Sequence, residues 1–121
     1  MKDEGDLRDR TKSFALRIIR LFRELPEAGD AQVIGKQVLR PGTSVGANYR
    51  EAWRSRSDAE FISKIGDCLK ELDETSYWPE LLVDAEIVPQ ARMAGLLDEA
   101  NQLLAVLTTI SKNTKKRIAA L

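Results

Sequence analysis

The fold is decided by the stretch Ile34-Gly-Lys-Gln-Val38-Leu-Arg-Pro41-Gly-Thr-Ser-Val45-Gly-Ala-Asn48-Tyr-Arg-Glu-Ala52. Its apolar and small residues recur at alternating steps of four and three, the spacing of one side of an α-helix. Because this stripe keeps its phase across Pro41, it predicts one helix from about Ala31 to Trp53 that bends at the proline. The alternative is a break at Pro41, which would give two shorter helices.

Helical spacing continues on both sides of this stretch. Residues 10–25 form the first predicted helix, with apolar residues on one side and arginines towards the other. Ser57 and Glu60 match a capping box directly before an apolar run, so they predict the start of a third helix. Pro79 falls inside that run and predicts a kink. Pro89 suits the first turn of a fourth helix that continues almost to the end of the sequence.

These four helices predict the fold class and the domain organisation. The chain has 121 residues, of which 43% are hydrophobic and 31% charged, a composition that supports one folded domain. Short connections between successive helices favour antiparallel neighbours. We therefore predict an all-α, antiparallel, up-down-up-down four-helix bundle over residues 10–121, preceded by a flexible acidic leader at 1–9.

The composition also narrows the chemistry that the chain can perform. The sequence contains no histidine, which excludes histidine-based metal sites and Ser-His or Cys-His nucleophile pairs. Cys68, the single cysteine, lies on an apolar stripe and reads as a small hydrophobic residue in a reducing compartment. The start of the sequence is polar, and no apolar run approaches a membrane span. We expect a cytoplasmic protein without catalytic, cofactor-binding or metal-binding residues.

Charge is sorted along the chain although the formal net charge is zero. Residues 10–23 and 36–56 are basic, residues 57–74 and 75–111 are acidic, and residues 112–117 are basic again. Three interpretations stay open: pairing between helices of one chain, pairing between subunits, or local basic surfaces for nucleic acid. The candidate nucleic-acid residues belong to two groups, namely Arg50, Arg54 and Arg56, and the cluster of Lys112, Lys115, Lys116 and Arg117.

Asn48 occupies a stripe position where an apolar side chain is expected. A buried amide requires a hydrogen-bond partner, so we expect Asn48 to bridge to another helix or to fix the helix register. A direct ligand role is the alternative. Together with its neighbours along the helix it forms a predicted structural polar core of Arg40, Ser44, Asn48 and Glu51.

Several apolar side chains are predicted to point outward from the bundle. Tyr77 and Trp78 are adjacent in sequence, so both cannot enter one core seam, and further residues lie off the main stripes. Extra apolar surface on a small chain is typical of a partner interface, and self-association is the default partner. The candidate oligomer interface consists of Tyr49, Trp53, Tyr77, Trp78 and Val106.

Three stretches, at 39–52, 57–72 and 77–82, resemble the bacterial four-helix-bundle protein family, also called the 23S ribosomal RNA intervening-sequence protein family. The resemblance covers about residues 12–116. An Arg-x-x-x-Ser-x-x-x-Asn-x-x-Glu pattern falls on Arg40, Ser44, Asn48 and Glu51. A Lys-x-Glu-Leu-x-Glu-Thr pattern falls on the segment Lys70, Glu71, Leu72, Asp73, Glu74 and Thr75.

The resemblance implies a single-domain antiparallel bundle that assembles into a homopentameric ring. Its relatives include proteins encoded inside ribosomal RNA insertions and the accessory protein of diversity-generating retroelements, an adaptor for a reverse transcriptase and RNA. It implies no catalytic residues. The sequence thus predicts a non-enzymatic oligomeric scaffold or adaptor, with an RNA- or nucleoprotein-binding module as the alternative.

Overall fold

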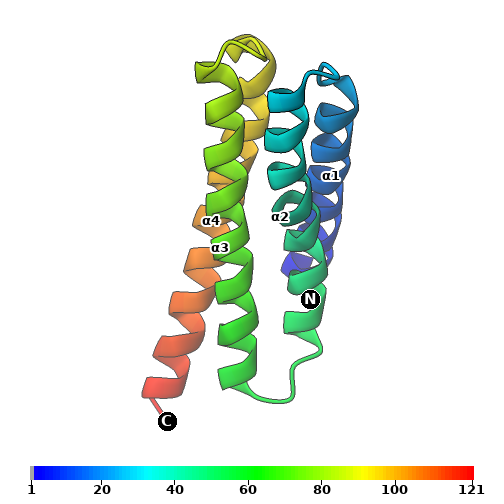
Figure 1. Ribbon diagram of the computed structural model, residues 1–121. Coiled ribbons are helices and arrows are strands. Elements are labelled where there is room, and N and C mark those ends of the chain that lie inside the picture. Colours follow the sequence, from blue (N-terminus) through cyan, green and yellow to red (C-terminus); the bar gives the residue numbers. More distant parts are fainter. Residues whose placement is uncertain (1) are drawn as a thin grey trace.

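The computed structural model describes the backbone of residues 2–121 and the side chains from Asp6 onward. Within these residues the fold is all-α, with four helices and no strand: α1 (Lys2–Glu24), α2 (Gly29–Trp53), α3 (Asp58–Asp84) and α4 (Gln90–Ala119). The helices lie side by side and are joined by short connections (Figure 1). None of these helices contains an apolar stretch that could cross a bilayer.

Helix α1 begins earlier than the sequence pattern predicts. Residues 2–9, predicted as a leader ahead of the domain, are helical, and the side chain of Leu7 is only 2% exposed. The cause is the spacing of Leu7, Thr11, Phe14 and Ile18, which extends the buried side of the helix towards its N-terminus.

The other helices follow the predicted boundaries closely. Helix α2 is continuous through the buried Pro41, so the prediction of one long helix is correct. Helix α3 also continues through Pro79, and its first turn is capped because the backbone N–H of Glu60 donates to Ser57 Oγ at 3.1 Å. Pro89 occupies the N-cap of α4 instead of its first turn.

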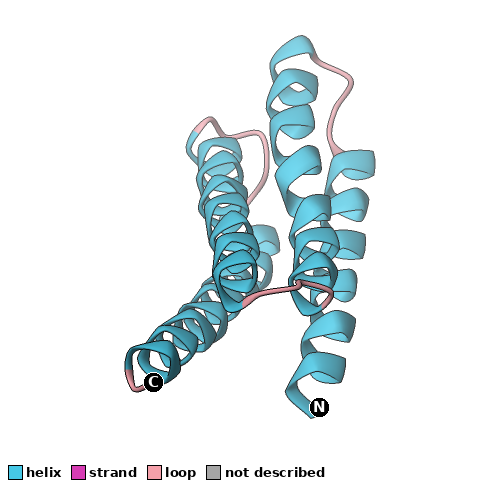
Figure 2. Cartoon of the chain, turned by 90° about the horizontal axis from the view of Figure 1, so that it is seen from below, coloured by secondary structure: helices cyan, strands magenta, loops and turns pink. Residues whose placement is uncertain are grey.

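Contacts between helices fix their order in the bundle. Helix α2 packs between α1 and α3, α4 packs on α3, and the side between α1 and α4 has the least packing. The last turns of α2 face the first turns of α3, as the pair of Glu51 with Lys64 shows. Seen from below, the C-terminal end of α4 lies well away from the N-terminal end of α1 (Figure 2). The end of α4 is therefore partly uncovered.

Three glycines on one side of α2 explain its close approach to α1. A Cβ atom at Gly42 would lie 2.7 Å from Ile18, and one at Gly35 would lie 2.6 Å from Leu25. At Gly46 the nearest atom would be the Thr11 hydroxyl oxygen, 3.1 Å away. A larger residue at position 35 or 42 would displace a packed side chain, and one at position 46 would press against Thr11. Sequence spacing alone does not reveal this contact, although the three glycines lie at helical intervals.

Candidate functional site

A row of polar side chains lies along the contact between α2 and α3. We call this row the polar seam, and it consists of Arg40, Ser44, Asn48 and Glu51 of α2 with Lys64, Glu71 and Glu74 of α3. The Asn48 side-chain amide donates to the carboxylate of Glu71. On either side of it, Lys64 Nζ lies 2.9 Å from Glu51 Oε2, and Arg40 lies 3.6 Å from Glu74. The bridge from Asn48 to another helix is the contact that the sequence predicts.

The four predicted polar core residues are not all buried. Asn48 and Ser44 are half-buried, whereas Arg40 and Glu51 are exposed. The physical reason is that the long Arg40 and Glu51 side chains reach out to solvent and meet their partners at the edge of the contact. The predicted polar core is therefore a seam at the surface.

Glu71 has the most unusual environment in the polar seam. Burial raises the pKa of its carboxyl above the ordinary value, and the hydrogen bonds from Asn48 and Ser44 and the charge of Arg40 only partly oppose this. Burial disfavours the charged form because the interior solvates a carboxylate less well than water. The charged form of Glu71 is therefore stabilised by side chains of α2 in place of water.

The five residues predicted at an oligomer interface have different positions. Tyr49 is fully buried and belongs to the core, so the prediction is wrong for this residue. Helix α2 packs on both α1 and α3, and its apolar face is consequently wider than one stripe. Trp53, Trp78 and Val106 are half-buried against the core. Tyr77 is 55% exposed.

An exposed apolar patch lies near the start of α2 and the end of α3. Val33, which is 63% exposed, lies two turns before Arg40 on the same side of α2. Tyr77 and Trp78 follow Glu74 by one turn and form an edge-to-face pair at 4.8 Å between ring centroids. Because Arg40 meets Glu74, Val33, Tyr77 and Trp78 share one end of the α2–α3 face. Val33 was not predicted because it lies off the apolar stripe of its helix.

A groove of about 700 Å³ opens at the other end of the bundle, between the α2–α3 connection and the end of α4. Trp53 and Phe61, whose ring centroids are 5.2 Å apart, and Ile110 supply apolar lining. Arg56 and Arg117 line the same groove. The structure thus brings together one residue from each of the two basic groups that the sequence offered as alternatives. Arg117 also lies 3.0 Å from Asp58.

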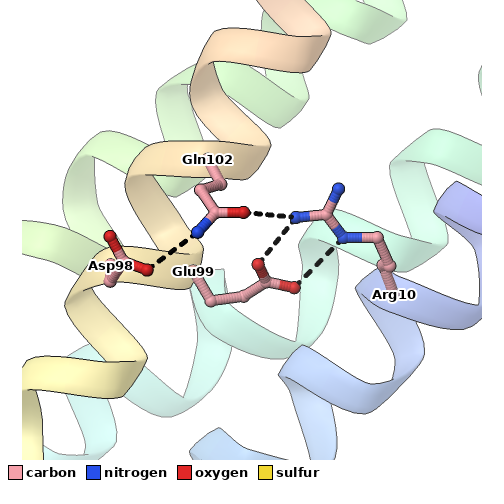
Figure 3. Close-up of polar contacts among 4 residues, drawn as sticks. All are labelled: Arg10, Asp98, Glu99 and Gln102. Atoms are coloured by element: carbon pink, nitrogen blue, oxygen red, sulfur yellow. Dashed lines mark hydrogen bonds and ion pairs between the residues drawn. The ribbon is translucent and has the colours of Figure 1, made fainter.

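Ion pairs join α1 to α4 where their packing is sparse. Arg10 Nη2 lies 2.7 Å from Glu99 Oε1, and Arg10 Nε donates to the other carboxylate oxygen at 3.3 Å (Figure 3). The hydrogen bond with Glu99 raises the pKa of Arg10. Gln102 accepts a further, longer bond from Arg10, and its own amide donates to Asp98 (Figure 3). Charge is therefore at least partly paired between helices of one chain.

The residues that could carry chemistry are few in the structure. In the described part of the chain no group of three or more His, Cys, Asp or Glu residues could hold a metal ion. Cys68 is buried, and its thiol donates to the carbonyl oxygen of Val45 at 3.6 Å. Burial raises the pKa of Cys68 to about 12, so the thiol stays protonated at neutral pH.

These observations define an all-α bundle protein that presents its candidate sites on its surface. Residues 4–109 match the 23S rRNA-intervening sequence protein family, and the chain belongs to this family. It is similar, with 38% identity and a TM-score of 0.85, to the crystal structure of a protein with unknown function from the S23 ribosomal protein family of Bacteroides thetaiotaomicron VPI-5482. That match covers 93% of this chain and 99% of the other. No functionally curated protein matches the sequence.

Proposed function

We propose that this protein is a non-enzymatic, self-associating scaffold of the cytoplasm. The observation that carries the proposal is the apolar patch formed by the exposed Val33 and Tyr77 with the half-buried Trp78. Large apolar and aromatic side chains that share one exposed face are typical of protein interfaces. A second copy of the chain is the simplest partner, because most soluble oligomers are built from identical subunits. The single free cysteine supports a reducing compartment.

The proposed assembly is a ring of antiparallel, up-down-up-down bundles. A closed ring forms when one face of each subunit contacts a different face of the next subunit, as in heterologous association. The proposed number of five subunits comes from the family resemblance, and a measured mass of the assembly tests it. The polar seam contributes by holding α2 and α3 in register, so that Val33 and Tyr77 lie on the same face.

Sedimentation velocity of the purified chain tests this proposal. We expect a species several times heavier than the 13.6 kDa chain at micromolar concentration. The double variant Val33→Asp with Tyr77→Asp should shift the mass towards the monomer while the circular dichroism spectrum keeps its helical form. Leu16→Asp, which alters an exposed apolar residue of α1, is the matched control. A wild-type monomer would overturn the proposal.

A second candidate is an accessory module that binds RNA or nucleoprotein. The specific observation in its favour is that Arg56 and Arg117 line one groove. Exposed basic residues surround this end of the bundle, and they comprise Arg54, Lys112, Lys115 and Lys116. Fluorescence anisotropy with a labelled single-stranded RNA tests this candidate. Binding should fall steeply between about 50 and 200 mM salt, since phosphate contacts release counterions.

A further inference from the structure

The groove at the end of the bundle combines two kinds of surface. Its apolar side is formed by the edge-to-face pair of Trp53 and Phe61, and its polar side by Arg56 and Arg117 from two different elements. Its volume of about 700 Å³ lies within the range of small-ligand sites in proteins. It lies at the end of the bundle where the C-terminal end of α4 is well separated from the N-terminal end of α1 (Figure 2).

We propose that this groove binds one nucleotide of a single-stranded nucleic acid, with the base against Trp53 and Phe61 and the phosphate at Arg56 and Arg117. The inference rests on the second candidate function. Aromatic side chains bind bases of any sequence through their π-faces, and arginines bind phosphate. The groove supplies both within one cavity.

The surrounding charge favours a polymeric anion. Residues 112–117 of α4 carry four basic residues and no acid. Arg117 lines the groove itself, and Lys112, Lys115 and Lys116 are exposed side chains next to lining residues of the same helix. They are placed to contact the phosphates that follow the bound nucleotide. Asp58, which also lines the groove, holds Arg117 there by their ion pair at 3.0 Å, and Arg56 is an exposed lining residue. An acidic peptide would use the arginines but would leave the aromatic side unused.

Tryptophan fluorescence gives a direct test, because the chain has two tryptophans in different surroundings. Trp53 lines the groove, whereas Trp78 lies 25 positions further along the chain and towards the other end of α3. The Trp78→Phe variant is titrated with a twelve-residue uridine RNA. We expect saturable quenching of Trp53. The Trp53→Phe variant, which retains only Trp78, should show no quenching by the same RNA.

Affinity measurements with groove variants provide the second test. Trp53→Leu keeps an apolar side chain but removes the indole, and we expect it to weaken binding of the labelled RNA about tenfold. The double variant Arg56→Gln with Arg117→Gln should weaken binding at least as much and should flatten the salt dependence. Lys36→Gln, at the start of α2, removes a positive charge far from the groove and serves as the control. Circular dichroism shows whether each variant is folded.

The outcomes separate this inference from the function on which it rests. If the RNA binds but Trp53→Leu has the affinity of the wild type and the RNA does not quench the Trp53 fluorescence, the groove assignment is wrong and nucleic-acid binding stands. If inorganic polyphosphate or polyglutamate quenches Trp53 as strongly as the RNA, the base makes no contact and the assignment also fails. An absence of RNA binding at low salt overturns both.

Discussion

The side-chain amide of Asn48 donates a hydrogen bond to the carboxylate of Glu71, and this contact joins α2 to α3 in the middle of the polar seam. Asn48 lies on the stripe that builds the core, so its amide requires a partner on the facing helix. Glu71 supplies the acceptor although its own burial disfavours the charged form. The pair therefore favours one register of α2 against α3.

The first prediction concerns the pH dependence of stability. Because the pKa of Glu71 is raised in the folded state, the folded protein binds this proton more tightly than the unfolded chain. The stability that it contributes is present below the ordinary pKa of a glutamate and is lost as the pH rises through the raised value. Glu71→Gln, which retains an acceptor for Asn48, should flatten this decline and raise the urea midpoint at pH 7.

Urea unfolding followed by circular dichroism between pH 4 and pH 7 measures this slope. Glu80→Gln, which alters an exposed carboxylate of the same helix, is the control and should leave the slope close to that of the wild type. An unchanged slope in Glu71→Gln would show that the buried carboxylate does not titrate differently in the two states.

The second prediction concerns the close contact of α1 with α2. An alanine at position 42 would place its Cβ 2.7 Å from a buried Ile18 carbon, so we expect Gly42→Ala to destabilise the fold by about 1–3 kcal/mol. Gly66 lies in α3, and a Cβ atom at this position would meet no packed neighbour within 4 Å. Gly66→Ala should therefore stabilise the fold by about 0.5–1 kcal/mol. Equal effects of the two changes in thermal unfolding would contradict the close-contact explanation.

The helices were predictable because their signals are local. The stripe that includes Pro41 keeps its phase, and Ser57 accepts a hydrogen bond from the backbone N–H of Glu60 within one turn. The start of α1 was not predicted, because acidic residues around Leu7 resemble a solvated leader until the facing helices bury that one side chain. Tyr49 was misplaced for a related reason. A single-helix pattern does not show that α2 has neighbours on two sides.

The candidate sites required the three-dimensional arrangement. Asn48 was identifiable as a polar residue on an apolar stripe, but the identity of its partner depends on the register of α3. Arg56 and Arg117 lie 61 positions apart in the sequence and line one groove only because α4 ends beside the α2–α3 connection. Val33 gave no periodic signal, because a residue off the stripe looks like any other surface position until its exposed neighbours are known.

The third prediction concerns the pair of Arg10 and Glu99. Its bidentate geometry and partial burial make it stronger than an ordinary surface pair, and we expect a coupling energy of about 1 kcal/mol. A double-mutant cycle with Arg10→Gln and Glu99→Gln measures this energy. The pair of Arg92 with Glu24 also joins α1 to α4 but is about half exposed, so the same cycle there should give a smaller value. A larger coupling at Arg92 would contradict this ranking.

The fourth prediction concerns Cys68. The thiol is buried and its pKa is raised to about 12, so it should not react with a thiol reagent at pH 8 in the folded protein. Labelling should occur in concentrated guanidinium chloride, where the side chain is exposed. In the absence of denaturant the labelling rate then reports opening of the α2–α3 contact. Rapid labelling of the native protein would show that this part of the core opens readily.

The fifth prediction concerns Trp78. Its Nε1 atom is buried and has no hydrogen-bond acceptor among the described residues, an arrangement that costs about 1–3 kcal/mol. Trp78→Phe removes this unpaired donor, which should stabilise the fold. It also removes part of the ring volume, which should destabilise the fold. We expect a change in the free energy of unfolding within about 1 kcal/mol. Leu82→Ala changes a buried residue of the same helix and only creates a cavity in the core, so it should lower the free energy of unfolding by about 2–5 kcal/mol. A loss above about 2 kcal/mol in Trp78→Phe would contradict this balance between the removed donor and the lost ring volume.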